Sequence, residues 1–320
     1  MDEEDLDRLL AAVEAELGRE WVDTIEWLRG QNEIDDVEAR IASGDVAGAV
    51  QGVEDAATRY AAAAADAYLV SGQRAAAWLD GLVDDALVTF DATNQRAVLW
   101  AQRNRLQLGG GVTTEQREVI RGAIAEGIGA GRNPREVARD IRDSLGLTEY
   151  QRSHVASYRR ALEAGDFANA LGRELRDGRS DKLLRRLARE DGQLTAAQVD
   201  RMVARYAENY VAYRAETIAR TEALRAVHQG ADEAFQQAID LGQIEAGQLE
   251  FEWLAGSAPR TRDWHASMNG QKRPPGEAFV SGQGNRLMFP GDPSAPASET
   301  ANCRCKRTAR LKPDEAAAAA

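Results

Sequence analysis

The stretch from Phe251 to Cys305 constrains the fold more than any other part of this sequence. It holds both cysteines, two of the six tryptophans and most of the eight prolines. Prolines and glycines set the shape of tight turns and interrupt regular elements. The segment LEFEWLA alternates apolar and acidic residues, which predicts a strand, and AFVSG, RLMFPG and CRCKRTARL predict shorter strand pieces. We therefore expect a small, loop-rich α+β module at this end of the chain.

Most of the remaining sequence has the spacing of amphipathic helices. Between Glu3 and Leu28, apolar residues recur every three or four positions and acidic residues fill the other faces. This single apolar stripe must pack against another helix, either within the chain or on a partner protein. From Val46 to Ala77 the chain is rich in alanine, and a stronger helical pattern resumes between Leu79 and Leu106.

Local capping signals divide residues 113–240 into a series of helices. Capping boxes, in which a threonine is followed three residues later by a glutamine, begin at Thr113, Thr148 and Thr195. Asn133 before Pro134 matches an N-cap followed by proline at the first helical position. These signals predict helices at about 114–129, 134–144, 149–172, 180–190 and 196–240.

Three consecutive glycines, Gly109–Gly111, are the clearest break in the helical pattern, because glycine in a helix interior costs backbone entropy. We interpret residues 109–112 as a linker between an acidic, alanine-rich helical arm (1–108) and a helical domain (113–215). A C-terminal module then spans 216–312, followed by a short tail (313–320) without packing signals. The predicted fold class is mainly α: an extended multi-helix body followed by a small α+β, loop-rich module.

The charge distribution bears on the class of partner. The net charge is −12, and residues 1–100 contain 22 acidic residues against 7 arginines. This part of the chain would repel DNA phosphates. Between residues 250 and 312 the balance reverses to ten basic against six acidic residues, which suits nucleic acid, an acidic partner or a mixed solvated surface.

The sequence has no apolar run long enough for a membrane helix and no signal-peptide pattern at its start, so we expect a cytoplasmic protein.

His265, Cys303 and Cys305 are candidate metal ligands, and Asp263 lies two residues before the histidine. A disulfide between positions i and i+2 of one strand has poor geometry, so we expect reduced thiols. Zinc takes four such ligands, although C-x-C is not its common C-x₂-C spacing. Two interpretations stay open: buried reduced thiols, which the spacing alone favours, and a zinc site. The sequence contains no GxSxG, HExxH or P-loop, so no catalytic residue is predicted.

Several short motifs follow one another between about residue 215 and residue 310: ARTE, a strand tryptophan, RTRDxH, NGQ, PGDP and NCRC. Their order resembles the phage Mu F-like head morphogenesis family of minor capsid proteins. The residues on these motifs are Arg220, Glu222, Trp253, Arg262, Asp263, His265, Pro290, Gly291, Asp292, Asn302, Cys303 and Cys305. The helical region 113–215 resembles the sequence that commonly precedes this module, whereas residues 1–110 contain no motif of the family.

The resemblance implies a structural and assembly protein of a tailed-phage head, associated with the portal vertex and needed for head morphogenesis. It implies the portal protein as partner, with the major capsid or scaffolding protein and packaged DNA as further partners. It also implies multiple copies inside the capsid near the portal, no membrane in the assembled head, and presence in the host cytoplasm during assembly.

The family is not established as enzymatic, and its motifs coincide with all four candidate ligands, which strengthens the zinc interpretation. Two alternatives to an assembly protein stay open. A metal-dependent nuclease or hydrolase would use Asp263 and His265 at a zinc ion with an open position facing a cleft, whereas a closed four-ligand site would indicate a structural role. A DNA-associated protein ejected with the genome would use the basic C-terminal end.

Overall fold

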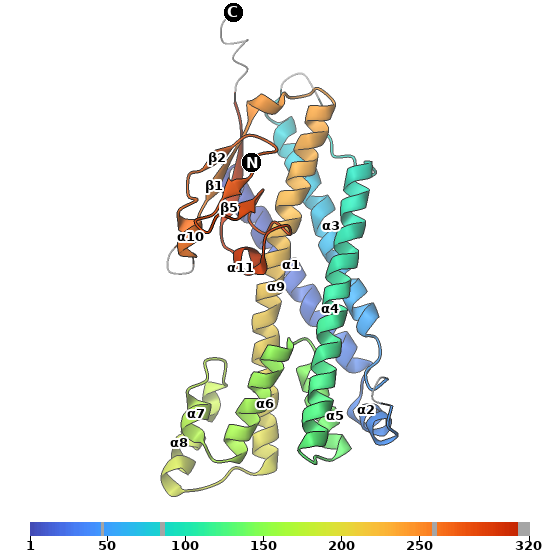
Figure 1. The fold of residues 1–320 in the computed structure, drawn as a ribbon, viewed down its shortest axis with the longest axis vertical. Coiled ribbons are helices and arrows are strands. Elements are labelled where there is room, and N and C mark those ends of the chain that lie inside the picture. The colour runs from blue at the N-terminus through green and yellow to red at the C-terminus, as the bar shows by residue number, and fades with distance from the viewer. Residues whose placement is uncertain (46–47, 84–86, 258–260, 313–320) are drawn as a thin grey trace, which may run out of the picture. The chain divides into compact units, whose positions relative to one another are not determined.

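The computed structural model describes residues 1–45, 48–83, 87–257 and 261–312, and most of them are helical (Figure 1). The helices are α1 (Glu3–Gly30), α2 (Ile34–Ala42), α3 (Val53–Asp80), α4 (Gln95–Gly129), α5 (Pro134–Ser144), α6 (Glu149–Glu163), α7 (Phe167–Leu171), α8 (Asp181–Glu190), α9 (Ala196–Asp240), α10 (Asp263–Ala266) and α11 (Ala297–Thr300). The strands are β1 (Leu249–Leu254), β2 (Lys272–Arg273), β3 (Phe279–Val280), β4 (Arg286–Leu287) and β5 (Lys306–Leu311). The predicted class, mainly α with a small α+β end, is confirmed. The predicted tail and Arg260 lie outside the described residues.

The chain folds into two compact units. The sheet unit contains Met1–Glu20, Tyr60–Gln107 and the chain from Glu216 onward, and the helical unit contains Trp21–Arg59 and Leu108–Ala215. The long helices α1, α3, α4 and α9 therefore contribute residues to both units. None of the helices in the described part of the chain combines the length and apolar character that a membrane crossing needs.

The sheet unit is built around β1, the central strand of an antiparallel sheet in the order β2–β1–β5. Trp253 of β1 lies opposite Arg307 of β5, and β3 and β4 form a separate antiparallel pair. The alternation in β1 buries Leu249, Phe251 and Trp253, which belong to one core with Phe235 of α9 and residues of α3. Figure 1 shows this sheet beside the C-terminal part of α9. The same core includes both cysteines.

Helix starts in the helical unit follow the capping signals closely. Asn133 caps α5, and the Thr148 hydroxyl and Gln151 side chain complete a capping box at α6, as predicted. The Thr195 hydroxyl accepts a hydrogen bond from the backbone N–H three residues later, at the start of α9. The predicted helices at 134–144 and 196–240 match α5 and α9, whereas the one predicted at 149–172 is divided into α6 and α7.

α4 runs without interruption through Gly109–Gly111. The predicted helix break at Gly109–Gly111 and the predicted helix start at Thr113 are therefore wrong. Gln116, predicted as the partner in that capping box, is buried, and its side chain bonds the backbone between α5 and α6 instead. The glycines cost helix propensity, but α4 buries Val112 and further apolar residues, and such packing overrides a local preference.

The apolar stripe of α1 is buried within the chain. Leu6, Leu17 and Leu28 each have no exposed surface, and Trp21 between them is also fully buried. Of the two alternatives for this stripe, packing within the chain or on a partner, the structure shows the first. Several acidic residues of α1, by contrast, are exposed at the surface, among them Glu4, Glu16 and Asp23.

Candidate metal centre

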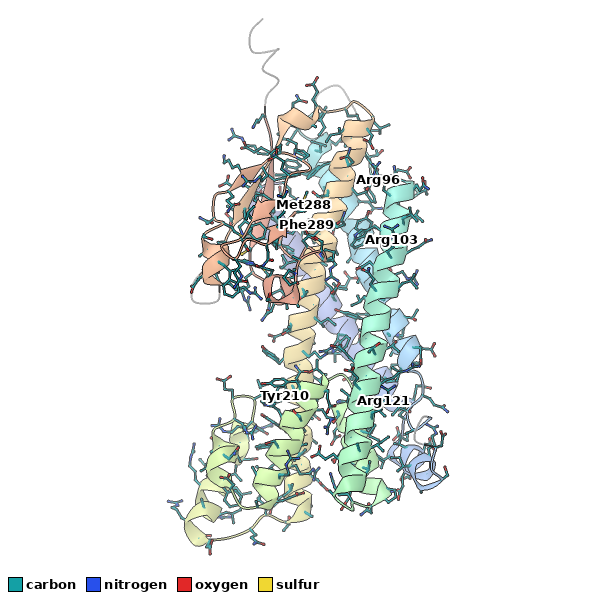
Figure 2. All side chains as sticks on the ribbon, viewed as in Figure 1. Arg96, Arg103, Arg121, Tyr210, Met288 and Phe289 are labelled. Atoms are coloured by element: carbon teal, nitrogen blue, oxygen red, sulfur yellow. The ribbon has the colours of Figure 1, made fainter. Side chains whose placement is uncertain are left out.

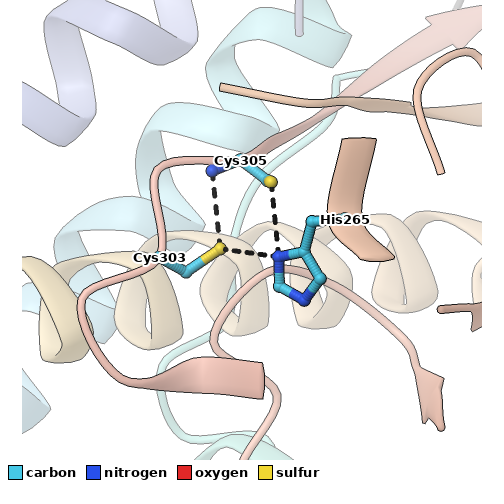
Figure 3. Close-up of side chains that lie close together, drawn as sticks. All are labelled: His265, Cys303 and Cys305. Atoms are coloured by element: carbon cyan, nitrogen blue, oxygen red, sulfur yellow. Dashed lines mark hydrogen bonds between the residues drawn. The ribbon is translucent and has the colours of Figure 1, made fainter. Parts of the chain in front are cut away.

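His265, Cys303 and Cys305 come together inside the sheet unit (Figure 3). Each of them is only 1% exposed. Nδ1 of His265 lies 3.5 Å from Sγ of Cys303 and 3.6 Å from Sγ of Cys305. The three ligand atoms all lie within 4.8 Å of one another, and the two cysteines are not joined in a disulfide. Nitrogen and sulfur donors in this arrangement suit a zinc ion.

Short elements position the three side chains. His265 lies on the one-turn helix α10, and both cysteines lie on the cysteine loop (residues 301–305), between α11 and β5. Asn302 has a left-handed backbone with φ of 53°, a conformation that asparagine adopts more readily than most residues. The Trp253 ring of β1 packs edge-on against the His265 imidazole, with 5.7 Å between ring centroids. The group is therefore shielded from water on the side of the sheet.

A fully buried carboxylate, Glu299 on α11, fixes the imidazole. Its Oε2 accepts hydrogen bonds from Nε2 of His265 (2.6 Å) and Nε1 of Trp264 (2.9 Å), and its Oε1 accepts from Ser281 (2.9 Å) and Asn285 (2.6 Å). Burial raises the pKa of Glu299, but these bonds outweigh it and hold the pKa below its usual value. An ionised carboxylate only accepts, so the imidazole proton is on Nε2 and the lone pair of Nδ1 faces the two sulfurs.

The sequence interpretation missed Glu299. The signal that points to it is a carboxylate between PGDP and NCRC, since histidine ligands usually donate their second N–H to a carboxylate or carbonyl. Spacing alone does not identify this carboxylate, because Glu299 and His265 are 34 positions apart.

Hydrogen bonds set the pKa values of the two thiols in opposite directions. The hydrogen bond from Cys303 lowers the pKa of Cys305 to about 7; burial opposes this, and the N–H groups of Gly256 and Trp253 support it. The same Cys303–Cys305 bond, together with burial, raises the pKa of Cys303 far above its usual value. Burial lowers the pKa of His265, but its bonds to Cys303 and Glu299 outweigh burial, and the pKa is raised. The Cys305 thiol therefore loses its proton more readily than the Cys303 thiol.

The structure does not bring Asp263 to this group. Its side chain is exposed, at the first position of α10, and its backbone carbonyl accepts from the N–H of Ser267. Among the described residues, the predicted set of four ligands is thus reduced to His265, Cys303 and Cys305.

The cysteine loop is fastened to α9 and α10 by motif residues. Arg220 donates to the side-chain oxygen of Asn302 at 2.5 Å, and the Thr221 hydroxyl accepts from the Asn302 backbone N–H at 3.0 Å. Arg262 donates to the first backbone carbonyl of the loop at 2.6 Å. The motifs ARTE, RTRDxH and NCRC therefore meet at one place, and their shared role is to hold the loop that presents the cysteines.

The remaining motif residues also make contacts within the sheet unit. Gly291 has φ of +90° and packs so closely on α9 that a Cβ there would lie 3.1 Å from Cβ of Leu224. Asp292 is buried and accepts from a backbone N–H four residues earlier at 2.7 Å. Glu222 is buried and pairs with Arg225 at 3.0 Å. PGDP thus shapes a turn that rests directly on the helix carrying ARTE.

A groove of about 600 Å³ lies beside the cysteine loop. Its lining includes Glu3, Asp7 and Glu14 of α1, Arg220 of α9, and Cys303, Arg304, Cys305 and Lys306. Lys306 pairs with Glu3 at 2.6 Å and with Asp7 at 2.9 Å, and Arg220 pairs with Glu14 at 2.6 Å. Acidic residues near the start of the chain thus pair with Lys306 of the basic C-terminal end and with Arg220 of α9.

The fold and the site define a mainly helical protein whose C-terminal α+β module encloses a His–Cys–Cys group. Residues 118–308 match the family described as Phage Mu protein F like protein. The match covers more than half of the chain, so the chain belongs to this family and is a protein of phage head morphogenesis. It extends well beyond the resemblance at 215–310 and includes most of the predicted helical domain. No curated protein and no solved structure matches the chain.

Proposed function

We propose that this chain is a minor capsid protein that is built into the head of a tailed phage at the portal vertex and is needed for head assembly. The observation that supports this role most directly is the family match over residues 118–308. The proposal includes several copies per head, located inside the capsid, with the portal protein as the principal partner. The major capsid or scaffolding protein and the packaged DNA are further neighbours in such a position.

The internal use of the motif residues supports a structural role. Arg220, Arg262 and Asn302 bond within the sheet unit, and Asp292 shapes a turn, so these side chains are committed to the fold. The acidic surface near the start of the chain suits a basic protein surface better than DNA, because like charges repel.

Assembly with and without the portal tests this function. The chain is co-expressed with the major capsid, scaffolding and portal proteins of its phage, and procapsids are purified and analysed by mass spectrometry. We expect the chain in procapsids that contain the portal and its loss from procapsids made without it. Equal incorporation in both would reject the portal as partner, and absence from both would reject a capsid role. Retention in emptied heads after DNA release would exclude ejection with the genome.

A metal-dependent nuclease or hydrolase is the second candidate, favoured by the groove beside both cysteines. The zinc-loaded protein is incubated with supercoiled plasmid and with a simple ester, beside a Cys303→Ser variant prepared in the same way. Turnover by the wild type alone would support this candidate. Equal background in both proteins would eliminate it and leave the assembly role.

A further inference from the structure

His265, Cys303 and Cys305 are spaced as ligands of one ion. Zinc–nitrogen bonds are about 2.0–2.1 Å and zinc–sulfur bonds about 2.3 Å, so at a tetrahedral angle the nitrogen and the sulfur lie about 3.6 Å apart. Nδ1 of His265 lies 3.5 and 3.6 Å from the two sulfurs. One imidazole nitrogen has a single lone pair or proton and can bond only one sulfur well, so hydrogen bonding does not explain two nearly equal distances.

We propose that the sheet unit binds one zinc ion through Nδ1 of His265 and the thiolates of Cys303 and Cys305, and that the fourth coordination position opens into the groove beside the cysteine loop. In the isolated protein this position takes a water molecule, which small anions or imidazole replace. Binding converts both thiols to thiolates and releases their protons to the solvent. Sulfur ligands select zinc over magnesium and calcium, which prefer oxygen.

Glu299 acts as a positioning residue for this ion. It holds Nε2 of His265 at 2.6 Å and is itself held by three further donors, so the imidazole cannot rotate without breaking a buried hydrogen-bond network. The carboxylate also makes Nδ1 a stronger electron donor. Outer carboxylates of this kind typically contribute 10-fold to 100-fold to metal affinity.

The cysteine loop is preorganised for the ion. Arg220 and Thr221 fix Asn302 from α9, and Arg262 fixes the start of the loop. These bonds hold both sulfurs near the imidazole before any metal arrives, which lowers the entropy cost of binding.

The fourth position is assigned to the groove for two reasons. Among the described residues, only His265, Cys303 and Cys305 place a potential ligand atom at this site, and Asp263 is exposed and lies outside it. The protein therefore fills three of the four coordination positions. Both cysteines contribute to the lining of the groove, so the groove is the open space that borders an ion bound between them. Three protein ligands with a solvent ligand form the usual open zinc site.

Cobalt(II) titration tests the ion and its open position in one experiment. Cobalt replaces zinc, and tetrahedral thiolate sites give sulfur-to-cobalt charge transfer in the near ultraviolet and d–d bands in the visible. We expect saturation at one equivalent, displacement of cobalt by zinc, and a shift of the d–d bands when azide or imidazole is added. Zinc content of the protein as purified, measured by native mass spectrometry, gives an independent count.

Matched variants identify the ligands. His265→Ala and Cys303→Ser are expected to lose the charge-transfer bands, with circular dichroism to check that the helices remain. Glu299→Gln is expected to weaken cobalt binding 10-fold to 100-fold and to shift the d–d bands, while Glu277→Gln, an exposed carboxylate of the same module, changes neither. Asp263→Asn is expected to leave both the stoichiometry and the spectrum unchanged.

Two results would overturn the proposal: one concerns the presence of the ion, and the other concerns its open fourth position. If no cobalt bands form and iodoacetamide modifies the thiols equally with and without zinc, the residues are buried thiols and there is no metal site. If the bands form but do not respond to azide or imidazole, the ion has a closed fourth position. Loss of the bands in Asp263→Asn would identify Asp263 as that fourth ligand. None of these results depends on the role in head assembly.

Discussion

At the scale of single residues, the structure explains several positions whose role the sequence does not reveal. Gly291 allows a turn to rest on α9, Asn302 adopts a left-handed backbone, and Glu299 orients His265. Buried charges also matter outside the metal centre. The helices carry many charged side chains, and Figure 2 labels two of them, Arg103 and Arg121, on α4. Most of the charged side chains are exposed, so the few buried ones have the larger effect on stability.

Gly291→Ala is expected to destabilise the sheet unit by about 2 kcal/mol or more, measured by urea denaturation. The alanine must adopt the left-handed backbone of this position, which costs a non-glycine residue about 1 kcal/mol. Its Cβ would also lie only 3.1 Å from Cβ of Leu224. Gly284→Ala is the matched control, because Gly284 also has a positive φ of +82° but no atom within 4 Å of its Cβ position. Equal losses in the two variants would show that the contact with α9 is unimportant.

Asp143→Asn is expected to change the pH dependence of the helical unit. Burial raises the pKa of Asp143 to about 6, while Arg29 opposes the shift and Asp140 adds to it. The folded state therefore binds this proton more tightly than the unfolded state, whose pKa is near 3.8. Stability gained from this group is present below pH 4 and is lost as the pH rises through about 6.

The expected result for Asp143→Asn is a gain of roughly 2 kcal/mol in unfolding free energy at pH 7.5, relative to wild type, which vanishes toward pH 4. Urea denaturation at several pH values between 4 and 8 measures this difference. A constant difference across the range would show that Asp143 does not titrate within it.

At the scale of elements, local signals place most helix ends correctly, but contacts between elements decide where they pack. α4 continues through three glycines, and α6 and α7 separate where one helix was predicted. The cysteine loop depends on α9, since Arg220 and Thr221 lie more than 80 positions before Asn302. No local pattern in the loop itself indicates this connection.

Gly110→Ala is expected to stabilise the protein by about 0.5–1 kcal/mol. Gly110 lies inside α4, and a Cβ there would meet nothing within 4 Å, so alanine gains helix propensity without a clash. Thermal melting of the variant beside wild type measures the effect. A loss of stability instead would indicate that the chain uses a flexible break at this position, as the sequence pattern first predicts.

Arg220→Ala and Asn302→Ala are expected to be coupled. Each variant removes one partner of a short hydrogen bond that involves a charged group, so each alone should lower the unfolding free energy by about 1–3 kcal/mol. The loss in the double variant should be smaller than the sum of the two single losses by at least about 0.5 kcal/mol. Urea denaturation of the four proteins gives the coupling free energy. Additive losses would mean that the Arg220–Asn302 bond does not fasten the loop in solution.

At the scale of the whole molecule, the chain is divided into two units, and four long helices contribute residues to both. The charge asymmetry of the sequence has a partial explanation in the sheet unit, where Lys306 pairs with Glu3 and Asp7, and Arg220 pairs with Glu14. The pairs of Lys306 reduce the basic charge available to DNA at the C-terminal end. They therefore weaken the alternative of a DNA-associated ejected protein.

Metal removal is expected to lower the melting temperature of the protein. A ligand present at 100 times its dissociation constant stabilises the folded state by about 2.7 kcal/mol, and chelation with EDTA removes this contribution. Differential scanning calorimetry of the zinc-loaded and chelated forms measures the shift. His265→Ala is the control, since its melting temperature should not respond to zinc or chelator. A wild-type melting temperature indifferent to both would contradict a bound ion.

The sequence by itself determined the mainly α class, the starts of α5, α6 and α9, the positions of β1, β3, β4 and β5, and the unsuitability of the two cysteines for a disulfide. These features depend on interactions within a few residues: apolar periodicity, N-caps, proline geometry and the short reach of a C-x-C pair. It also singled out His265, Cys303 and Cys305, because they are both cysteines of the chain and one of its three histidines in a single short segment.

Only the tertiary structure decided the rest. The continuity of α4 through Gly109–Gly111, the exposure of Asp263 and the pairing of Glu299 with His265 depend on packing between segments that are distant in sequence. Each glycine in a helix interior costs about 1 kcal/mol relative to alanine. Burial of the apolar face of α4 contributes more than this cost, so packing keeps the helix continuous. A hydrogen bond between residues 34 positions apart has no periodicity to reveal it. The chain must fold before that carboxylate and that imidazole meet.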